Sequence, residues 1–265
     1  MTASWDNTAW VWDAESGQQV MVLQGHTFPV HSAVYSPDGR WIVTASWETA
    51  RVWDAESGQQ MMDLQHTSDV NSAAYSPDGR WIVTGARILP GPGGPGTARV
   101  WDAEGGQQMM DLQQTSDVNS AVYSPDGRWI VTASDDSTAW VWDAESGQQK
   151  VTLQGHTSLV NSAAYSPDGH WIVTASYDGT ARVWDAESGQ QMAVLQGHTD
   201  SVSAAAYSPD GRWIVTASGD GTARVWPWPD VEGLLAEARS RLARELTCQE
   251  RVQYLHEDLD CRAEE

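Results

Sequence analysis

GHTSLVNSAAYSPDGHWIVTASYDGTARVWDAESGQQMAVL, residues 155–195, is the stretch that decides the fold. Residues 160–165 predict a short strand, and the β-branched and aromatic residues of 171–176 predict a second. Between them, Ser166-Pro167-Asp168-Gly169 predicts a turn, because Pro presets φ and Gly permits a positive φ. Two further short strands follow after glycine-containing turns, at 180–184 and 191–195. Four antiparallel strands joined by hairpins form a sheet that cannot bury both of its faces alone, so several such sheets must pack together.

The same unit recurs along the whole chain. Ser-Pro-Asp-Gly occurs five times, starting at Ser36, Ser76, Ser124, Ser166 and Ser208. Val-Trp-Asp-Ala-Glu also occurs five times, with its Trp at Trp12, Trp53, Trp101, Trp142 and Trp184. A sixth copy, Val225-Trp226, is followed by Pro227. Copies at this spacing are typical of solenoids, propellers and repeat arrays.

Gly-His pairs precede the Trp-Asp pairs in several copies, as at Gly25-His26, Gly155-His156 and Gly197-His198. On these motifs, residues 1 to about 226 resemble the WD-repeat family. The resemblance implies an all-β propeller over residues 1–226, which binds other proteins.

Four full blades are expected, with two partial blades at the ends of the repeat region. The full blades are Val30–Leu64, Val70–Leu112, Val118–Leu153 and Val160–Leu195. Six blades are therefore predicted, the terminal ones incomplete; the alternative is a five-bladed closed ring completed by the strand Gln18–Leu23. The chain is expected to be the C-terminal piece of a longer repeat protein, and its open strand edges predict self-association.

The resemblance also implies a buried, hydrogen-bonded tetrad of His, Thr, Asp and Trp in each blade. Two sets are complete: His156, Thr174, Asp178 and Trp184; and His198, Thr216, Asp220 and Trp226. The other blades depart from it, with Glu48 in place of Asp, a longer loop at 87–96, and Gln114 in place of His.

Catalysis, metal binding and cofactor binding are not expected. The tetrad contains triad residue types, but it recurs in neighbouring blades, whereas an active site occurs once. The histidines His26, His66, His156 and His198 belong to different blades and have no zinc-ligand spacing. The Gly- and Pro-rich stretch 87–96 lacks the Lys-Ser/Thr of a phosphate-binding loop.

The net charge of −21 makes nucleic acid and anionic membranes poor partners. No apolar run approaches the roughly 20 residues of a membrane span, and the N-terminus is not a signal peptide. Cys248 and Cys261 cannot form a disulfide framework and fit a reducing cytosol. A cytoplasmic location is therefore expected.

The differences between copies fall in two loops, before the first strand and between the second and third strands. Strand direction places both at one end of each blade, which predicts one variable face, where binding residues belong. The candidate partner-binding residues are Trp5, Phe28, Trp47, Asp69, Asp117, Asp135, Leu159, Tyr177 and Asp200. Their acidic members suit a protein or peptide partner with basic residues.

After residue 226 the pattern changes to helical spacing, with a capping box at Thr247-Cys248-Gln249-Glu250. A short helical tail is predicted for 227–265. Residues 243–251 resemble the tail of bacterial proteins that join a STAND-type signalling NTPase to WD repeats.

The sequence therefore predicts a non-catalytic interaction scaffold or ligand-sensing module of a bacterial signalling protein. A propeller enzyme, such as a hydrolase or lyase with its site at the central channel, is one alternative. A truncated paralogue without function is another, favoured by the missing strands and the incomplete tetrads.

Overall fold

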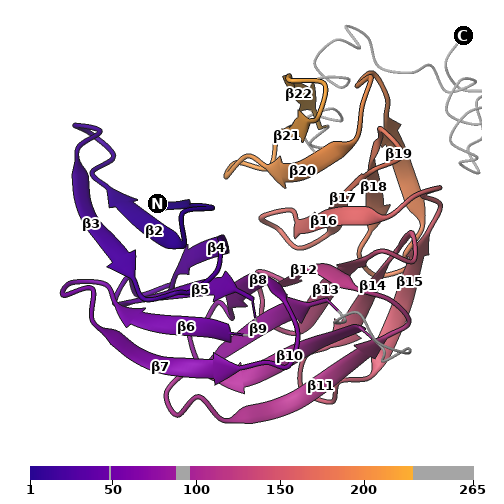
Figure 1. Ribbon diagram of the computed structural model, residues 1–265. Coiled ribbons are helices and arrows are strands. Elements are labelled where there is room, and N and C mark those ends of the chain that lie inside the picture. Colours follow the sequence, from indigo (N-terminus) through magenta and orange to yellow (C-terminus); the bar gives the residue numbers. More distant parts are fainter. Residues whose placement is uncertain (48, 88–95, 229–265) are drawn as a thin grey trace, which may run out of the picture. The chain divides into compact units, whose positions relative to one another are not determined.

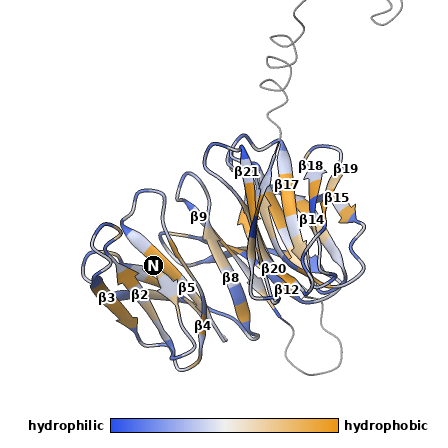
Figure 2. Ribbon diagram, turned by 90° about the horizontal axis from the view of Figure 1, so that it is seen from above, coloured by the Kyte–Doolittle hydropathy of each residue, from blue (hydrophilic) through white to orange (hydrophobic). Residues whose placement is uncertain are grey.

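The computed structural model describes residues 1–47, 49–87 and 96–228, and residues Met1–Pro227 form one compact unit. Its described residues form antiparallel sheets that follow one another in chain order (Figure 1). We number these sheets blade 1 to blade 6. Hydrophobic residues concentrate on the strands, and hydrophilic residues concentrate on the turns that join them (Figure 2).

Four blades have four strands each. Blade 2 comprises β4 (Val30–Tyr35), β5 (Trp41–Ser46), β6 (Thr49–Asp54) and β7 (Gln60–Gln65). Blade 3 comprises β8 (Val70–Tyr75), β9 (Trp81–Ala86), β10 (Gly96–Asp102) and β11 (Gln108–Gln114). Blade 4 comprises β12 (Val118–Tyr123), β13 (Trp129–Ser134), β14 (Thr138–Asp143) and β15 (Gln149–Gln154). Blade 5 comprises β16 (Val160–Tyr165), β17 (Trp171–Ser176), β18 (Ala181–Asp185) and β19 (Gln191–Leu195).

The two terminal blades have three strands each among the described residues. Blade 1 comprises β1 (Thr2–Ala3), β2 (Thr8–Trp12) and β3 (Gln19–Gln24). Blade 6 comprises β20 (Val202–Tyr207), β21 (Trp213–Ser218) and β22 (Ala223–Pro227). The prediction of four full and two partial blades is confirmed. The five-bladed alternative is wrong, because β3 pairs with β2 in blade 1 and does not complete blade 6.

The Ser-Pro-Asp-Gly turns set the register of the first hairpin in each blade. In blade 5, Gly169 has a φ of 76°, a left-handed conformation that favours glycine. The Ser166 hydroxyl accepts a hydrogen bond from Trp171 N at 2.9 Å, which closes the turn. Beyond it, Tyr165 pairs with Ile172 and Ala163 with Thr174.

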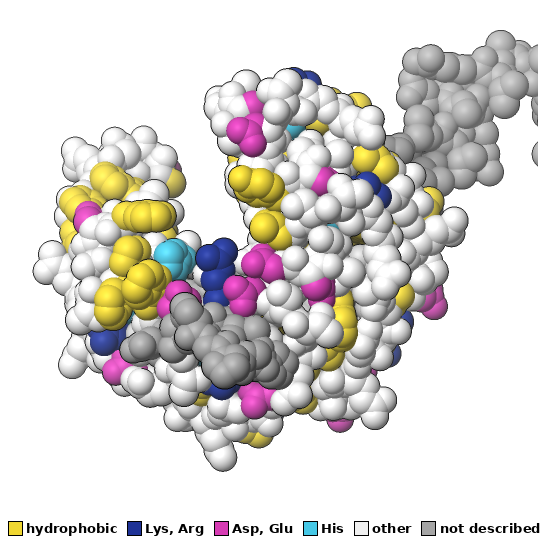
Figure 3. Space-filling view, turned by 45° about the vertical axis from the view of Figure 1, so that its right-hand side comes forward, with side chains coloured by type: hydrophobic (Ala, Val, Ile, Leu, Met, Phe, Trp, Pro, Cys, Tyr) yellow, Lys and Arg dark blue, Asp and Glu magenta, His cyan; other side chains and the backbone are white. Residues whose placement is uncertain are grey.

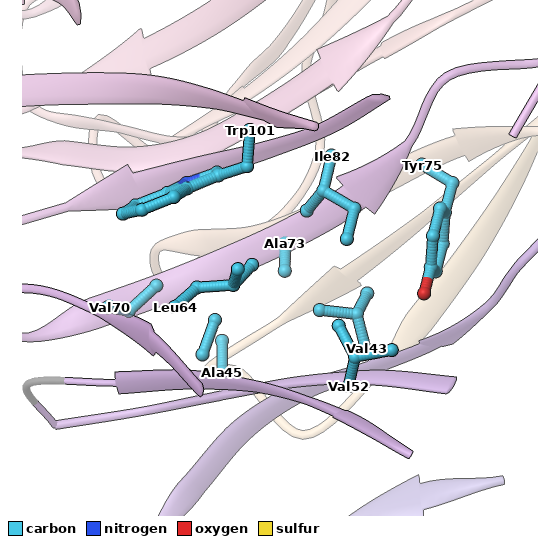
Figure 4. Packing of buried hydrophobic residues seen from close by; sticks show 10 residues of the cluster. Val43, Ala45, Val52, Leu64, Val70, Ala73, Tyr75, Ile82 and Trp101 are labelled. Atoms are coloured by element: carbon cyan, nitrogen blue, oxygen red, sulfur yellow. The ribbon is translucent and has the colours of Figure 1, made fainter. Parts of the chain in front are cut away.

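Neighbouring blades pack through two apolar faces, and we call the face directed at the following blade the forward face. Val43, Val52 and Leu64 lie on the forward face of blade 2. They meet Ile82 and Trp101 on the rear face of blade 3 (Figure 4). Burying each such side chain contributes roughly 1.5–3 kcal/mol, so contacts between blades supply most of the core.

Among the described residues, no further blade covers the forward face of blade 6. Val215 and Val225 are 42% and 62% exposed, whereas the equivalent Val173 and Val183 of blade 5 are fully buried. On the rear face of blade 1, Trp12 is 40% exposed. The outermost faces of the described blades are therefore apolar and open to solvent.

The predicted helical tail lies outside the described residues from 229 onward. In the part of the chain that the structure describes, no helix is long and apolar enough to cross a membrane.

Candidate binding face

The complete tetrads form continuous hydrogen-bonded networks. In blade 5, Trp184 Nε1 donates to Thr174 Oγ1 at 2.8 Å, and His156 Nε2 lies 2.8 Å from the same hydroxyl. The His156 Nδ1 lies 2.9 Å from Asp178 Oδ2. The structure thus brings together the four side chains that the sequence predicts, and they link β17, β18 and the loop before β16.

Blade 6 repeats the arrangement with His198, Thr216, Asp220 and Trp226, at 2.9 Å for each outer bond and 2.8 Å for the bond between His198 and Thr216. Its Asp220 has a pKa below the usual range because Thr222 and His198 hydrogen-bond its carboxylate.

Burial shapes the electrostatics of the blade 5 network. It raises the pKa of Asp178, but hydrogen bonds from Thr180, His156 and Thr157 outweigh it and hold that pKa at about 2. Burial also lowers the pKa of His156, although Asp178 opposes the shift. Thr174 is completely buried, and its hydroxyl is bonded to the side chains of Trp184 and His156.

In blades 2 and 3, the Trp–Thr and His–Thr bonds are both present among the described residues. His26 lies 2.7 Å from Thr44 Oγ1, and His66 lies 3.1 Å from Thr84 Oγ1. Burial, together with the charge of Arg51, lowers the pKa of His26 to about 4, and burial with the charge of Arg99 lowers that of His66 to about 3. Glu48 and residues 88–95, on which the sequence predicted the departures of these blades, lie outside the described residues.

In blade 4, Gln114 occupies the histidine position and is 2% exposed. Neither its Oε1 nor its Nε2 has a hydrogen-bond partner among the described residues. Trp142 Nε1 still donates to Thr132 Oγ1 at 2.8 Å, and Asp136 accepts a hydrogen bond from Thr115. The network is therefore broken at one side chain while the groups on either side of it stay in place.

The two variable loops of each blade lie side by side. In blades 3, 4 and 5, Arg87 N, Asp135 N and Tyr177 N donate to the carbonyl oxygens of Asp69, Asp117 and Leu159, at 2.8, 3.1 and 3.0 Å. The loops that the sequence predicts at one end of the blades are thus joined by backbone hydrogen bonds. We call the surface that they form the variable face.

Aromatic side chains project from the variable face. Phe28 and Trp47 of blade 2 stack with ring centroids 4.9 Å apart, and they remain 38% and 42% exposed. Trp5 of blade 1 is 83% exposed, and Tyr177 of blade 5 is 60% exposed. Phe28 and Trp47 therefore form one projecting apolar unit.

The acidic candidates differ in their surroundings. Asp200 is exposed, while Asp69, Asp117 and Asp135 are half-buried. Asp135 Oδ1 accepts a hydrogen bond from Asn119 Nδ2 at 2.6 Å. Leu159 contributes its carbonyl, which accepts hydrogen bonds from Tyr177 N and Ser176 Oγ.

Blades 2 to 4 carry a polar cluster that the sequence did not predict. Arg87 Nη2 donates to Asn119 Oδ1 at 3.3 Å, which links it to Asp135. His31 lies close enough for its pKa to respond: partial burial lowers it, Asp69 raises it and Arg87 lowers it. Figure 3 shows basic, acidic and histidine side chains gathered beside a group of hydrophobic ones.

A signal for this cluster was present in the sequence. His31 stands where the next three blades carry Asn71, Asn119 and Asn161. The side-chain amide of each asparagine donates to the backbone carbonyl oxygen of the first residue in the next blade's first strand. Asn161 Nδ2, for example, donates to Val202 O at 2.8 Å. His31 interrupts this series of asparagines, so position 31 differs from the positions that make the bond between blades.

The opposite ends of the blades carry the Ser-Pro-Asp-Gly turns, which are nearly alike. Ser36 Oγ donates to Asp38 Oδ1 at 2.6 Å, and that bond holds the pKa of Asp38 below its usual range. The Arg40 guanidinium lies 5.8 Å from the Trp41 ring centroid. These contacts explain the repeated sequence by turn structure. Within the described residues, no three His, Cys, Asp or Glu side chains are placed to hold a metal ion.

Comparison with protein families agrees with the repeat pattern. The model for the family described as "WD domain, G-beta repeat" matches residues 17–54, 58–102, 106–143, 147–185 and 189–227. Each match runs from the last strand of one blade through the third strand of the next. A search of curated proteins gave no match.

Proposed function

Since the chain belongs to the WD-repeat family, we propose that it is a non-catalytic scaffold or sensing module that binds a protein or peptide on its variable face. WD repeats generally mediate protein–protein interaction. The partner then contacts one end of the blades, and the tetrads stabilise the fold.

The stacked pair Phe28 and Trp47 is the observation that carries this proposal. Large aromatic side chains are enriched among the residues that dominate binding energy. These two are exposed on the face where the repeats diverge, and the same positions carry Ser68 and Arg87 in the next blade. Two large rings half-open to solvent support a docking function better than a packing function.

The charge of the variable face supports a partner with basic residues. Asp69, Asp117, Asp135 and Asp200 all lie on it, and the chain has a net charge of −21. Complementary charge speeds association and selects among partners. Arg87 is a basic residue on the same face, and its contact with Asn119 keeps it beside Asp135.

The burial of Thr174 supports a non-catalytic role. A Ser/Thr-His-Asp nucleophile needs its hydroxyl open to substrate. The Thr174 hydroxyl is instead enclosed and is bonded to Trp184 and His156. The same arrangement recurs in blade 6, as expected for a structural motif.

We also propose that the module is cytoplasmic and is part of a bacterial signalling protein. The support is the resemblance of residues 243–251 to the tail of STAND-type NTPase/WD-repeat proteins, together with the paucity of cysteine. Fractionation of bacterial cells that express the tagged chain should recover it with cytosolic proteins.

Selection from a displayed random-peptide library tests the binding proposal. The full chain should select peptides that combine basic and apolar residues. Their affinity should fall about tenfold or more for Phe28→Ser with Trp47→Gly. These residues occupy the same positions in other blades, so the fold accommodates them.

A matched pair of charge variants separates the variable face from the bulk negative charge. The first double variant is Asp69→Asn with Asp135→Asn, on the variable face. The second is Glu56→Gln with Glu145→Gln, at the opposite end of the blades, and it changes the net charge by the same amount. We expect loss of affinity for the first pair and little change for the second. Equal losses, or selected peptides that bind the Phe28→Ser/Trp47→Gly variant unchanged, would contradict the proposal.

A further inference from the structure

An open hollow lies on the variable face between blades 5 and 6. It has a volume of about 440 Å³. Its walls are the turn Tyr177–Thr180, between β17 and β18, and the loop Gln196–Ser201, before β20. The two walls approach closely, since a Cβ built on Gly179 would lie 3.6 Å from Asp200 O.

The walls combine an aromatic ring with carboxylates and include neither Lys nor Arg. Tyr177 is 60% exposed, and Asp200 is exposed as well. The carboxylate of Asp178 is already engaged by His156, with Arg182 Nη2 4.0 Å away. Asp200 Oδ1 accepts a hydrogen bond from Ser201 N at 2.6 Å, so its negative charge is fixed at the rim of the hollow.

This combination occurs at a single junction among the described residues of blades 2 to 6. The two positions hold Tyr177 and Asp200 here. At the three other junctions they hold Trp47 and Ser68, Arg87 and Ser116, and Asp135 and Ser158. The blades otherwise repeat one another. The repeated structure of the turns therefore does not explain why Tyr177 and Asp200 occur together at this junction.

We infer that this hollow binds an arginine side chain of the protein or peptide partner. The inference rests on the proposed function and specifies what the partner presents to the face. The planar guanidinium stacks on the Tyr177 ring while its N–H groups bond the Asp200 carboxylate. A lysine ammonium offers one compact charge and no planar face, so it binds more weakly. An acidic side chain is repelled by Asp200 and Asp178.

Titration of the ¹⁵N-labelled full chain with acetyl-Gly-Gly-Arg-Gly-Gly-amide tests the inference by NMR. The backbone amides of Tyr177, Gly179 and Asp200 should shift in a saturable manner. The peptides with citrulline or Glu in place of Arg should cause no such shift, and the peptide with Lys should bind more weakly. Asp200→Asn should weaken arginine binding about fivefold, and Tyr177→Leu about two- to fivefold. Tyr177→Phe, which keeps the ring, should bind as the unaltered chain does.

The junction of blades 4 and 5 offers a matched gain of function. Asp135→Tyr with Ser158→Asp reproduces the pair there and should add a second set of saturable shifts around residues 135 and 158. The absence of saturable shifts with the Arg peptide, or equal shifts with the citrulline peptide, overturns the inference. A second outcome is that the Arg peptide shifts these amides, while library peptides bind the Phe28→Ser/Trp47→Gly variant as tightly as the unaltered chain. That result supports arginine binding in the hollow and contradicts the proposed aromatic docking site. If the library peptides bind through Phe28 and Trp47 but no arginine effect is seen, this inference alone fails.

Discussion

Replacing Gln114 with His should repair the interrupted network of blade 4. Gln114 is almost fully buried, and both polar atoms of its amide lack a partner among the described residues. The groups that a histidine would meet are present, since Thr132 still accepts from Trp142 and Asp136 still occupies its turn. The perturbation therefore supplies one missing member to an otherwise assembled set.

The expected gain follows from the blade 5 network. Leaving a buried polar group unsatisfied costs about 1–3 kcal/mol, and each hydrogen bond formed contributes roughly 1 kcal/mol net. A histidine placed like His156, with bonds of 2.8 and 2.9 Å, removes the unsatisfied amide and adds two bonds. Burial of the imidazole offsets part of this. We expect a net increase of about 1–3 kcal/mol in the free energy of unfolding, with roughly 2–4 °C in Tm for each kcal/mol.

Urea and thermal unfolding of four proteins measure this effect. Gln114→His should be the most stable, followed by Gln114→Met, which removes the unsatisfied atoms without forming the network, and then by the unaltered chain. The reverse change, His156→Gln, should be the least stable. If Gln114→His is no more stable than Gln114→Met, relief of the amide explains the gain and the network does not. If it is no more stable than the unaltered chain, the buried amide of Gln114 carries no cost and the histidine adds no stabilising bonds.

Three further predictions concern the tetrads and the outer faces. The pKa of His66 is about 3 in the folded chain and about 6.5 in the unfolded chain. Between these pH values the unfolded chain binds a proton that the folded chain does not, so the free energy of unfolding falls as pH drops through this window. The urea midpoint of His66→Gln should therefore vary less with pH than that of the unaltered chain, and an imidazole that titrates near 6.5 by NMR would contradict this. Asp178→Ala should lower the free energy of unfolding by about 1–3 kcal/mol, because it strands His156, whereas Asp69→Ala on the same face should change it little; equal Tm shifts would count against the network. The chain should self-associate with increasing concentration, and Val225→Asp should reduce this in analytical ultracentrifugation, because Val225 is 62% exposed on an apolar face; a chain that stays monomeric at all concentrations would contradict the prediction.

The fold was predictable because every blade repeats the same local signals. The predicted strands at 160–165 and 171–176 coincide with β16 and β17, and the predicted limits Val160–Leu195 coincide with blade 5. The alternative closure by Gln18–Leu23 failed for a physical reason. This segment forms β3, which pairs with Trp10 and Val11 of β2, the strand directly before it in the chain. A hairpin to an adjacent strand closes a short loop, whereas pairing with β22 would have required a long one.

The candidate face was predicted less completely. The sequence located the variable loops, because differences between copies can be read from the copies themselves. It could not show that Phe28 stacks on Trp47, or that Arg87 reaches Asn119, since such contacts depend on side-chain reach across neighbouring loops and blades. It also identified Gln114 as a departure but could not show that its amide is enclosed without a partner.

The exposed forward face of blade 6 has a consequence for how the molecule opens. Each inner blade packs against two neighbouring blades, whereas among the described residues blade 6 packs against blade 5 alone. In a stack whose stability is close to a sum of nearest-neighbour terms, the unit with a single neighbour separates first. Amide exchange in β20–β22 should therefore proceed through local opening of blade 6, while β12–β15 exchange through much rarer events. Near-identity of the repeats makes the position of a blade in the stack, more than its composition, the main determinant of its lifetime in the closed state.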